Sequence, residues 1–291
     1  MTPPAQTPAA RKTLGIKPRP ASARRSASTR PAAPAAVKAV AVAAPGERLS
    51  KRVAFLMHCS RREAEQYIEG GWVSVNAQVV EEPMVRVTDQ TIVVDPNASL
   101  MAMTDVTLLL HKPPGLDAMA PLGAANKRVQ PAQYLLQAAT HWAQDESGSR
   151  VLKHHLAKLT AAVPLEAAAS GLVVFTQDWR VLRKLTEDAA FIEHEFLVEV
   201  QGEVSAEALH HLNALGVMEQ LPPFKASVNS TGDAVTRLRF AIKGAHPGLI
   251  AYLCERASLH ILSMKRLRIG RVVLAHLPQG QWRYLHAGER F

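Results

Sequence analysis

Hydrophobic and polar positions follow two patterns in residues 104–291. Residues 195–200 and 235–242 alternate between apolar and polar side chains, which is typical of strands with one buried face. Residues 107–110 and 171–176 are largely continuous apolar runs, and they predict buried strands. We expect helices over 180–187, 206–215 and 248–256, and closing strands over 259–262, 272–275 and 282–285. Because strands and helices do not alternate regularly, this order predicts an α+β fold with a mixed, mostly antiparallel sheet.

A shorter unit precedes it, over residues 47–98. Apolar residues at helical spacing predict a first helix over 49–58. Ser60 and Glu63 have the spacing of a capping box, which predicts that a second helix starts here and ends at Gly70-Gly71. Short strands are expected over 72–75, 78–80 and 91–94, with a turn at Asn76-Ala77.

The composition is that of a globular protein. The chain has 291 residues, of which 47% are hydrophobic, and no apolar run approaches the roughly 18 residues that a membrane span requires. Cys59 and Cys254 are the two cysteines, too few for a disulfide framework, so we expect a reducing, cytoplasmic environment. The sequence contains no phosphate-binding glycine loop and no paired cysteine clusters for zinc. We therefore expect no cofactor, no metal and no membrane partner.

The positive charge is concentrated at one end of the chain. The net charge is +9, yet residues 1–46 hold eight Lys and Arg residues, eight prolines and no acid. This composition predicts a disordered basic arm. We favour contact with nucleic-acid phosphates through counterion release. A solubilising extension and a targeting peptide are the alternatives, although the arm lacks the apolar core of a secretory signal.

The short unit carries a local basic patch although its own net charge is −2. Five of its six bases lie on or beside the two predicted helices, whereas four of its acids lie beyond them. Such a patch is either a solvated helix face or a placed phosphate contact. Charge alone favours the solvated face.

The residue pattern of this unit changes that balance. Arg48-Leu49-Ser50-Lys51, Cys59-Ser60-Arg61-Arg62-Glu63-Ala64 and Gly71-Trp72-Val73-Ser74-Val75-Asn76 resemble the alpha-L RNA-binding motif, first known from ribosomal protein S-four. The resemblance implies that the two helices recognise structured RNA by its shape and phosphates. The residues that it directs toward RNA are Arg48, Lys51, Arg52, Ser60, Arg61 and Arg62.

Four motifs of residues 104–291 resemble the RsuA-type pseudouridine synthases, in the order found in that family. They are Leu110-His111-Lys112-Pro113-Pro114-Gly115, Ser170-Gly171-Leu172-Val173-Val174-Phe175-Thr176-Gln177-Asp178, Phe196-Leu197-Val198-Glu199-Val200, and Lys265-Arg266-Leu267-Arg268-Ile269-Gly270 with Leu277-Pro278 and Trp282-Arg283 after it. The resemblance implies a monomeric protein that acts on structured RNA, above all ribosomal RNA, without cofactor or metal. It further implies RNA contacts for Lys112, Lys265, Arg266 and Arg268.

The catalytic positions of that family are altered in this chain. The family places its aspartate in Gly-Arg-Leu-Asp, where this chain has Val163-Pro164-Leu165-Glu166, and its stacking tyrosine where this chain has Phe196. Glu166 is longer than Asp by about 1.5 Å, and a displacement of about 1 Å can cost on the order of a hundredfold in rate. The family's arginine-rich stretch aligns with residues 243–251, which contain no arginine. We therefore expect Glu166 to lack the cation that holds such a carboxylate ionised.

Three hypotheses follow for the function. The first is an RNA-binding homologue of the pseudouridine synthases whose catalysis is impaired or lost. The second is an active uridine isomerase that uses Glu166 in place of the aspartate. The third is a scaffold that binds protein through the old cleft, for which the apolar segment Leu249-Ile250-Ala251 is the one indication.

Overall fold

The computed structural model describes residues 46–100, 104–123 and 129–291. The arm predicted over residues 1–46 lies outside these ranges except for its last residue. No helix of the described ranges has the length and apolarity to cross a bilayer. The same ranges contain no group of three or more His, Cys, Asp and Glu side chains arranged to hold a metal ion.

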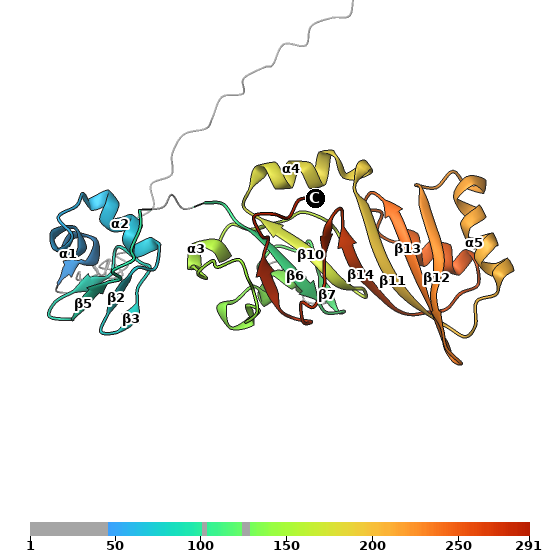
Figure 1. Ribbon diagram of the computed structural model, residues 1–291, viewed down its shortest axis with the longest axis horizontal. Coiled ribbons are helices and arrows are strands. Elements are labelled where there is room, and N and C mark those ends of the chain that lie inside the picture. Colours follow the sequence, from blue (N-terminus) through green and yellow to red (C-terminus); the bar gives the residue numbers. More distant parts are fainter. Residues whose placement is uncertain (1–45, 101–103, 124–128) are drawn as a thin grey trace, which may run out of the picture. The chain divides into compact units, whose positions relative to one another are not determined.

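The short unit consists of two helices and small antiparallel sheets (Figure 1). Its helices are α1 (Leu49–Leu56) and α2 (Arg61–Glu69). Its strands are β1 (Glu47–Arg48), β2 (Val73–Val75), β3 (Gln78–Val79), β4 (Arg86–Val87) and β5 (Ile92–Val94), with β3-β2-β5 as one sheet and β1 paired with β4. An apolar cluster centred on Leu49, Val53 and Ile68 joins the helices to the strands.

Local signals in the sequence set the ends of these elements. The Ser60 hydroxyl accepts a hydrogen bond from the Glu63 amide at 3.2 Å, and the Glu63 carboxylate accepts one from the Ser60 amide at 2.7 Å. The predicted capping box is therefore confirmed. Asn76 and Ala77 both have positive φ angles, of 50° and 64°, as a tight hairpin turn requires.

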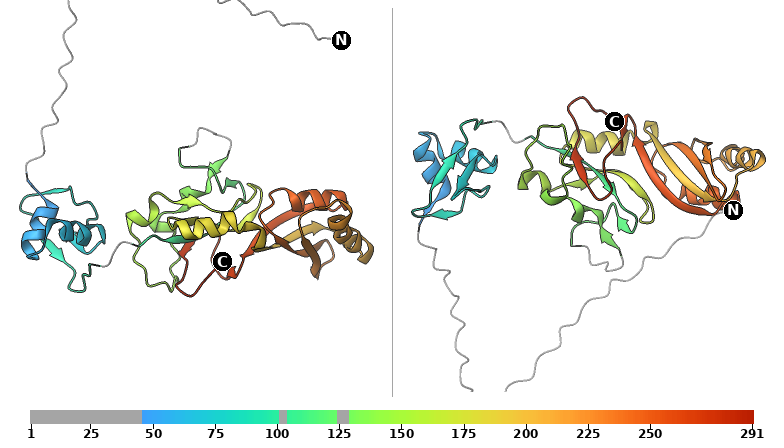
Figure 2. Two further views of the ribbon diagram at one scale, coloured as in Figure 1. Left: turned by 90° about the horizontal axis from the view of Figure 1, so that it is seen from above. Right: turned by 60° about the horizontal axis from the view of Figure 1, so that its bottom comes forward.

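The large unit is built on a nine-stranded mixed sheet (Figure 2). Seven strands follow the order β12-β13-β11-β14-β10-β6-β16, while β9 and β15 pair with β10 and β14. Only β10 and β14 run parallel among these pairs, which confirms the predicted α+β fold with a mostly antiparallel sheet. The bounds are β6 (Thr107–Lys112), β9 (Thr160–Ala161), β10 (Ser170–Thr176), β11 (Glu193–Gln201), β12 (Phe224–Thr231), β13 (Val235–Lys243), β14 (Ile261–Ile269), β15 (Val272–Val273) and β16 (Trp282–Tyr284).

Two apolar clusters explain the two hydrophobic patterns in the sequence. One contains residues of helices α5 (Ala206–Met218) and α6 (Leu249–Arg256), and the other contains Leu185 of α4 (Trp179–Glu187). Neighbouring residues of β6 and β10 enter different clusters, so these strands are apolar throughout. By contrast, β11 and β13 bury alternate residues, and their other residues form ion pairs such as Arg237–Glu199.

The remaining elements are short or were not predicted. They are β7 (Leu116–Asp117), β8 (Gln130–Pro131), α3 (Lys153–Leu156) and three 3-10 turns at Ala132–Leu135, Ala138–Thr140 and Ala189–Phe191. The sequence did not indicate β12, because this edge strand buries only Ala226 and lacks clean alternation. The strand predicted over 259–262 begins at Ile261 and continues to Ile269. Domain bounds at 47–98 and 104–291 stay a prediction.

One row of residues crosses five neighbouring strands. Phe240, Phe196, Arg266, Gly171 and Lys112 lie opposite one another in β13, β11, β14, β10 and β6. Gly171 has a φ angle of +115°, and a Cβ atom there would overlap the backbone of Arg266. Glycine is therefore required where β10 approaches β14, at the point where the parallel pairing begins.

We expect Gly171→Ala to lower the free energy of unfolding by about 3 kcal/mol or more, since it combines an unfavourable φ angle with overlap against backbone. Gly148→Ala is the matched control, because Gly148 also has positive φ but a Cβ atom added there would meet no other atom within 4 Å. The control should cost only about 1–2 kcal/mol. Urea unfolding of the full chain measures both, and equal costs would contradict the close-approach explanation.

Candidate active site

Two buried cations hold the loop that precedes β10, residues 163–169. The Arg266 guanidinium donates from Nη1 to the Pro164 carbonyl at 2.7 Å and from Nε to the Leu172 carbonyl at 2.8 Å. The Lys112 ammonium donates to the carbonyls of Ala167 at 3.1 Å and Ala169 at 2.6 Å. Lys112 and Arg266 thus bind backbone carbonyls on either side of Glu166.

Burial has a large effect on both cations. It lowers the pKa of Arg266 to about 9, while the charge of Glu166 acts in the opposite direction. It lowers the pKa of Lys112 to about 8; the charge of Arg266 adds to this shift, and the charges of Glu166 and Asp117 oppose it. Both groups carry their proton near neutral pH.

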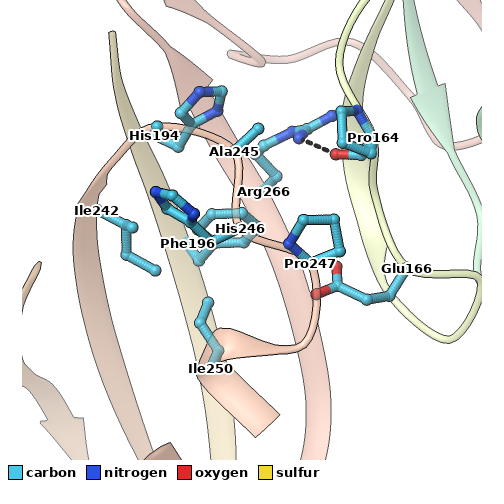
Figure 3. A pocket seen from close by; sticks show the side chains of 11 residues that line it. Pro164, Glu166, His194, Phe196, Ile242, Ala245, His246, Pro247, Ile250 and Arg266 are labelled. Atoms are coloured by element: carbon cyan, nitrogen blue, oxygen red, sulfur yellow. Dashed lines mark hydrogen bonds between the residues drawn. The ribbon is translucent and has the colours of Figure 1, made fainter. Parts of the chain in front are cut away.

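The Glu166 carboxylate is held by the start of a helix. Its Oε1 atom accepts a hydrogen bond from the Gly248 amide at 2.7 Å, and Gly248 is the N-cap residue of α6. No side chain of the helix itself caps this end. Since helix N-termini attract negative charge, the carboxylate stabilises α6 from outside. Figure 3 shows Glu166 beside Pro247, with the helix beginning below them.

A small pocket lies between Glu166 and the sheet (Figure 3). Phe196 and Arg266 line it from β11 and β14, and the guanidinium lies 6.0 Å from the centre of the Phe196 ring. Residues 244–247, which connect β13 to α6, line its other side. The cavity volume is about 10 Å³, which is close to the space that a single water molecule needs.

His194 is a pocket residue that the sequence did not single out. It is 1% exposed, and its Nδ1 atom is buried without a hydrogen-bond partner among the described residues. Burial, together with the charge of Arg266 and two further basic neighbours, lowers the pKa of His194 to about 3. The imidazole is therefore neutral. Its place on the buried face of β11, two residues before Phe196, is the signal that identifies it.

The structure corrects the expectation that Glu166 lacks a nearby cation. The family's arginine-rich stretch is indeed replaced, but Arg266 lines the same pocket from a different strand. The scaffold hypothesis also loses its indication, because Leu249 and Ile250 are 8% and 3% exposed and pack in the core.

The four bases expected to contact RNA in the large unit differ in their exposure and in their partners. Lys112 and Arg266 are 0% and 1% exposed and bind backbone carbonyls, so their burial contradicts the expected contact with RNA. Arg268 is half-buried and forms ion pairs with Glu193 and Glu195. Lys265 is half-buried on β14.

The bases expected to contact RNA in the short unit lie at its surface. Lys51, Arg52, Arg61 and Arg62 are exposed, and Arg48 is half-buried. Lys51 pairs with Glu47 at 2.6 Å and Arg61 with Glu65 at 3.2 Å, which are weak pairs at this exposure. The exposed Ser60 hydroxyl caps α2, so its first role is structural.

Comparison with known proteins gives the class of each unit. The S4 domain family matches residues 47–93. An uncharacterised RNA pseudouridine synthase of Aquifex aeolicus is 26% identical over 82% of this chain and 92% of its own length. The ribosomal large subunit pseudouridine synthase B of Vibrio vulnificus is 26% identical over 81% of this chain and 71% of its own.

Two further proteins are similar to most of the chain. The dual-specificity RNA pseudouridine synthase RluF of Escherichia coli K12 is 25% identical over 82% of this chain and 75% of its own length. A crystal structure of a pseudouridylate synthase aligns with a TM-score of 0.47 at 19% identity, over 82% of this chain and 95% of that one. The chain thus carries an S4 domain, and the relatives that it resembles along most of its length are RNA pseudouridine synthases. Both resemblances seen in the sequence are confirmed.

The buried position of Lys112 predicts a pH-dependent contribution to stability. The folded chain releases this proton near pH 8, whereas the ordinary pKa is 10.5. The unfolded chain therefore binds more protons between these values, and the contribution of Lys112 to stability rises with pH across them. Lys112→Met should be less stable than wild type at pH 7, because three carbonyls lose their donor. The difference in the free energy of unfolding between wild type and Lys112→Met should widen toward pH 10.

Urea unfolding of both proteins near pH 7 and near pH 10 measures this gap. Lys225→Met is the control, since Lys225 is an exposed lysine of β12. A gap for Lys112→Met that is constant or narrows with pH would contradict the assigned shift.

Proposed function

We propose that this protein is an RNA-binding homologue of the ribosomal RNA pseudouridine synthases in which catalysis is impaired or lost. The observation that supports this most directly is the hydrogen bond from the Gly248 amide to the Glu166 carboxylate. The group at the position of the catalytic aspartate has a structural partner, and that partner directly follows residues 244–247, which line the pocket.

The size of the pocket supports the same proposal. Isomerisation requires the uridine to leave its helix and enter the site. Small-molecule sites usually have volumes of roughly 300–1,000 Å³, whereas this cavity holds about 10 Å³. Residues 244–247 line one side of this cavity, and Gly248, which follows them, donates to Glu166.

The second candidate is an active isomerase that uses Glu166. The position of Arg266 favours it, because a protonated guanidinium lines the pocket and its proton is favoured by the charge of Glu166. Phe196 retains an aromatic surface at the position of the family's stacking residue. The longer Glu side chain and the closed loop count against this candidate.

The RNA partner follows from the short unit and from the relatives. The exposed bases of α1 and α2 match a surface that binds phosphates, and two of the relatives are named for the ribosomal large subunit or for RNA modification. We therefore propose that the protein acts as a cytoplasmic monomer that binds ribosomal RNA, with the arm over residues 1–46 adding unspecific attraction to phosphates.

Mapping of pseudouridine separates the two candidates. We expect ribosomal RNA from cells that lack this gene, and from cells carrying Glu166→Ala, to contain the same pseudouridines as wild-type RNA. A pseudouridine that disappears in both strains would establish the active isomerase. Purified Glu166→Ala should meanwhile lose about 1 kcal/mol of stability, the usual cost of removing a helix cap. Glu187→Gln, an exposed change on α4, is the control for both measurements.

The basic face of the short unit predicts the salt dependence of RNA binding. We expect Arg61→Ala combined with Arg62→Ala to weaken binding of ribosomal RNA fragments and to flatten the slope of log affinity against log salt by about one to two charges. Arg237→Ala with Arg239→Ala removes the same charge from β13, where both arginines pair with glutamates. Equal effects of the two double changes would assign binding to net charge instead of to the α1–α2 face.

A further inference from the structure

The C-terminal end of α1, the first helix of the S4 domain, carries three exposed apolar side chains. Phe55 is 75% exposed, Leu56 is 48% exposed and Met57 is 39% exposed. The opposite side of α1 supplies Leu49 and Val53 to the core, so these three residues are not needed for packing. Three consecutive exposed apolar residues form a continuous patch, and contiguous apolar patches mark candidate interaction sites.

Basic residues surround this apolar tip. Lys51 precedes Phe55 by one helical turn, and Arg52 precedes Leu56 by one turn, so each pair shares a face of α1. All four side chains are exposed. The exposed face of α1 therefore changes from cationic to aromatic and apolar along its length.

A tight turn brings the second helix close to the same tip. The Cys59 amide donates to the Ala54 carbonyl at 3.1 Å, and the His58 amide donates to the Phe55 carbonyl at 3.4 Å. The chain then enters α2 at Arg61, so Arg61 and Arg62 begin within a few residues of Phe55. Residues of α1 and α2 share one apolar cluster, so the bases of both helices belong to the same helix pair as Phe55.

Two of these bases are available to a ligand. Within the described residues, Lys51 and Arg61 form ion pairs with Glu47 and Glu65, whereas Arg52 and Arg62 take part in none. Exposed guanidinium groups on the same pair of helices as an exposed aromatic ring suit a nucleotide, which offers an apolar base beside its phosphates.

We propose that Phe55 stacks on an unpaired base of the bound RNA while Arg52 and Arg62 contact the phosphates beside it. This inference rests on the proposed RNA-binding function and adds a preference for RNA with unpaired nucleotides. The charge of the surrounding residues favours RNA over a protein partner, because phosphates complement all four bases of this face.

The test compares two RNAs and several full-length variants. The RNAs are a hairpin with an unpaired loop that carries a fluorescent adenine analogue, and the fully paired duplex of its stem. Phe55→Leu should lower affinity for the hairpin about tenfold and abolish the fluorescence change, and it should leave duplex affinity unchanged. Phe55→Trp should preserve both signals. Arg52→Ala should weaken binding of both RNAs through its lost phosphate contact.

Phe191→Leu is the matched control, since Phe191 is 82% exposed in the large unit and undergoes the same chemical change. Hairpin affinity within twofold of wild type for Phe55→Leu would overturn the proposal and would assign the apolar tip to a protein contact. Equal losses with hairpin and duplex would overturn it as well, because stacking on an unpaired base cannot affect a closed duplex. If the wild-type protein binds neither RNA, the RNA-binding function itself fails.

Discussion

The close approach of β10 to β14 at Gly171 determines the geometry of the large unit. A side chain at this position would overlap the backbone of Arg266, so the parallel pairing of the two strands depends on a residue without one. The pairing sets the register of Arg266 against its neighbours, and the antiparallel pairing with β6 sets that of Lys112. Both long cationic side chains consequently reach the loop over residues 163–169 from the strands on either side of β10.

In this arrangement the charges of Lys112 and Arg266 have a structural role, which is distinct from a role in chemistry. Lys112 and Arg266 are nearly inaccessible to solvent, and each offsets the cost of its burial by donating to several backbone carbonyls. The loop that carries Glu166 needs both of them to take its shape. This structural role is enough to account for both cations, so their presence does not by itself indicate catalysis.

The sequence predicted those features that depend on short-range patterns. The capping box of Ser60 and Glu63 lies within three residues, and the buried face of β13 follows from strict alternation. Features that depend on register between distant segments could not be predicted. Lys265, Arg266 and Arg268 lie close together in the sequence. The pairing of Arg266 with Gly171 is what shows that Arg266 is the buried one. The partnership of Glu166 with Gly248 joins residues 82 positions apart and leaves no local signal.

The position of Glu166 links these distant features to the function of the pocket. A carboxylate that caps α6 is stabilised by a helix N-terminus, whereas a carboxylate that attacks a sugar or transfers a proton must face a substrate. The contact uses one carboxylate oxygen, Oε1, and it joins Glu166 to the residue that follows the pocket-lining residues 244–247. The basic face of α1 and α2 contributes no residue to this pocket, so the proposed binding of RNA there does not require catalysis.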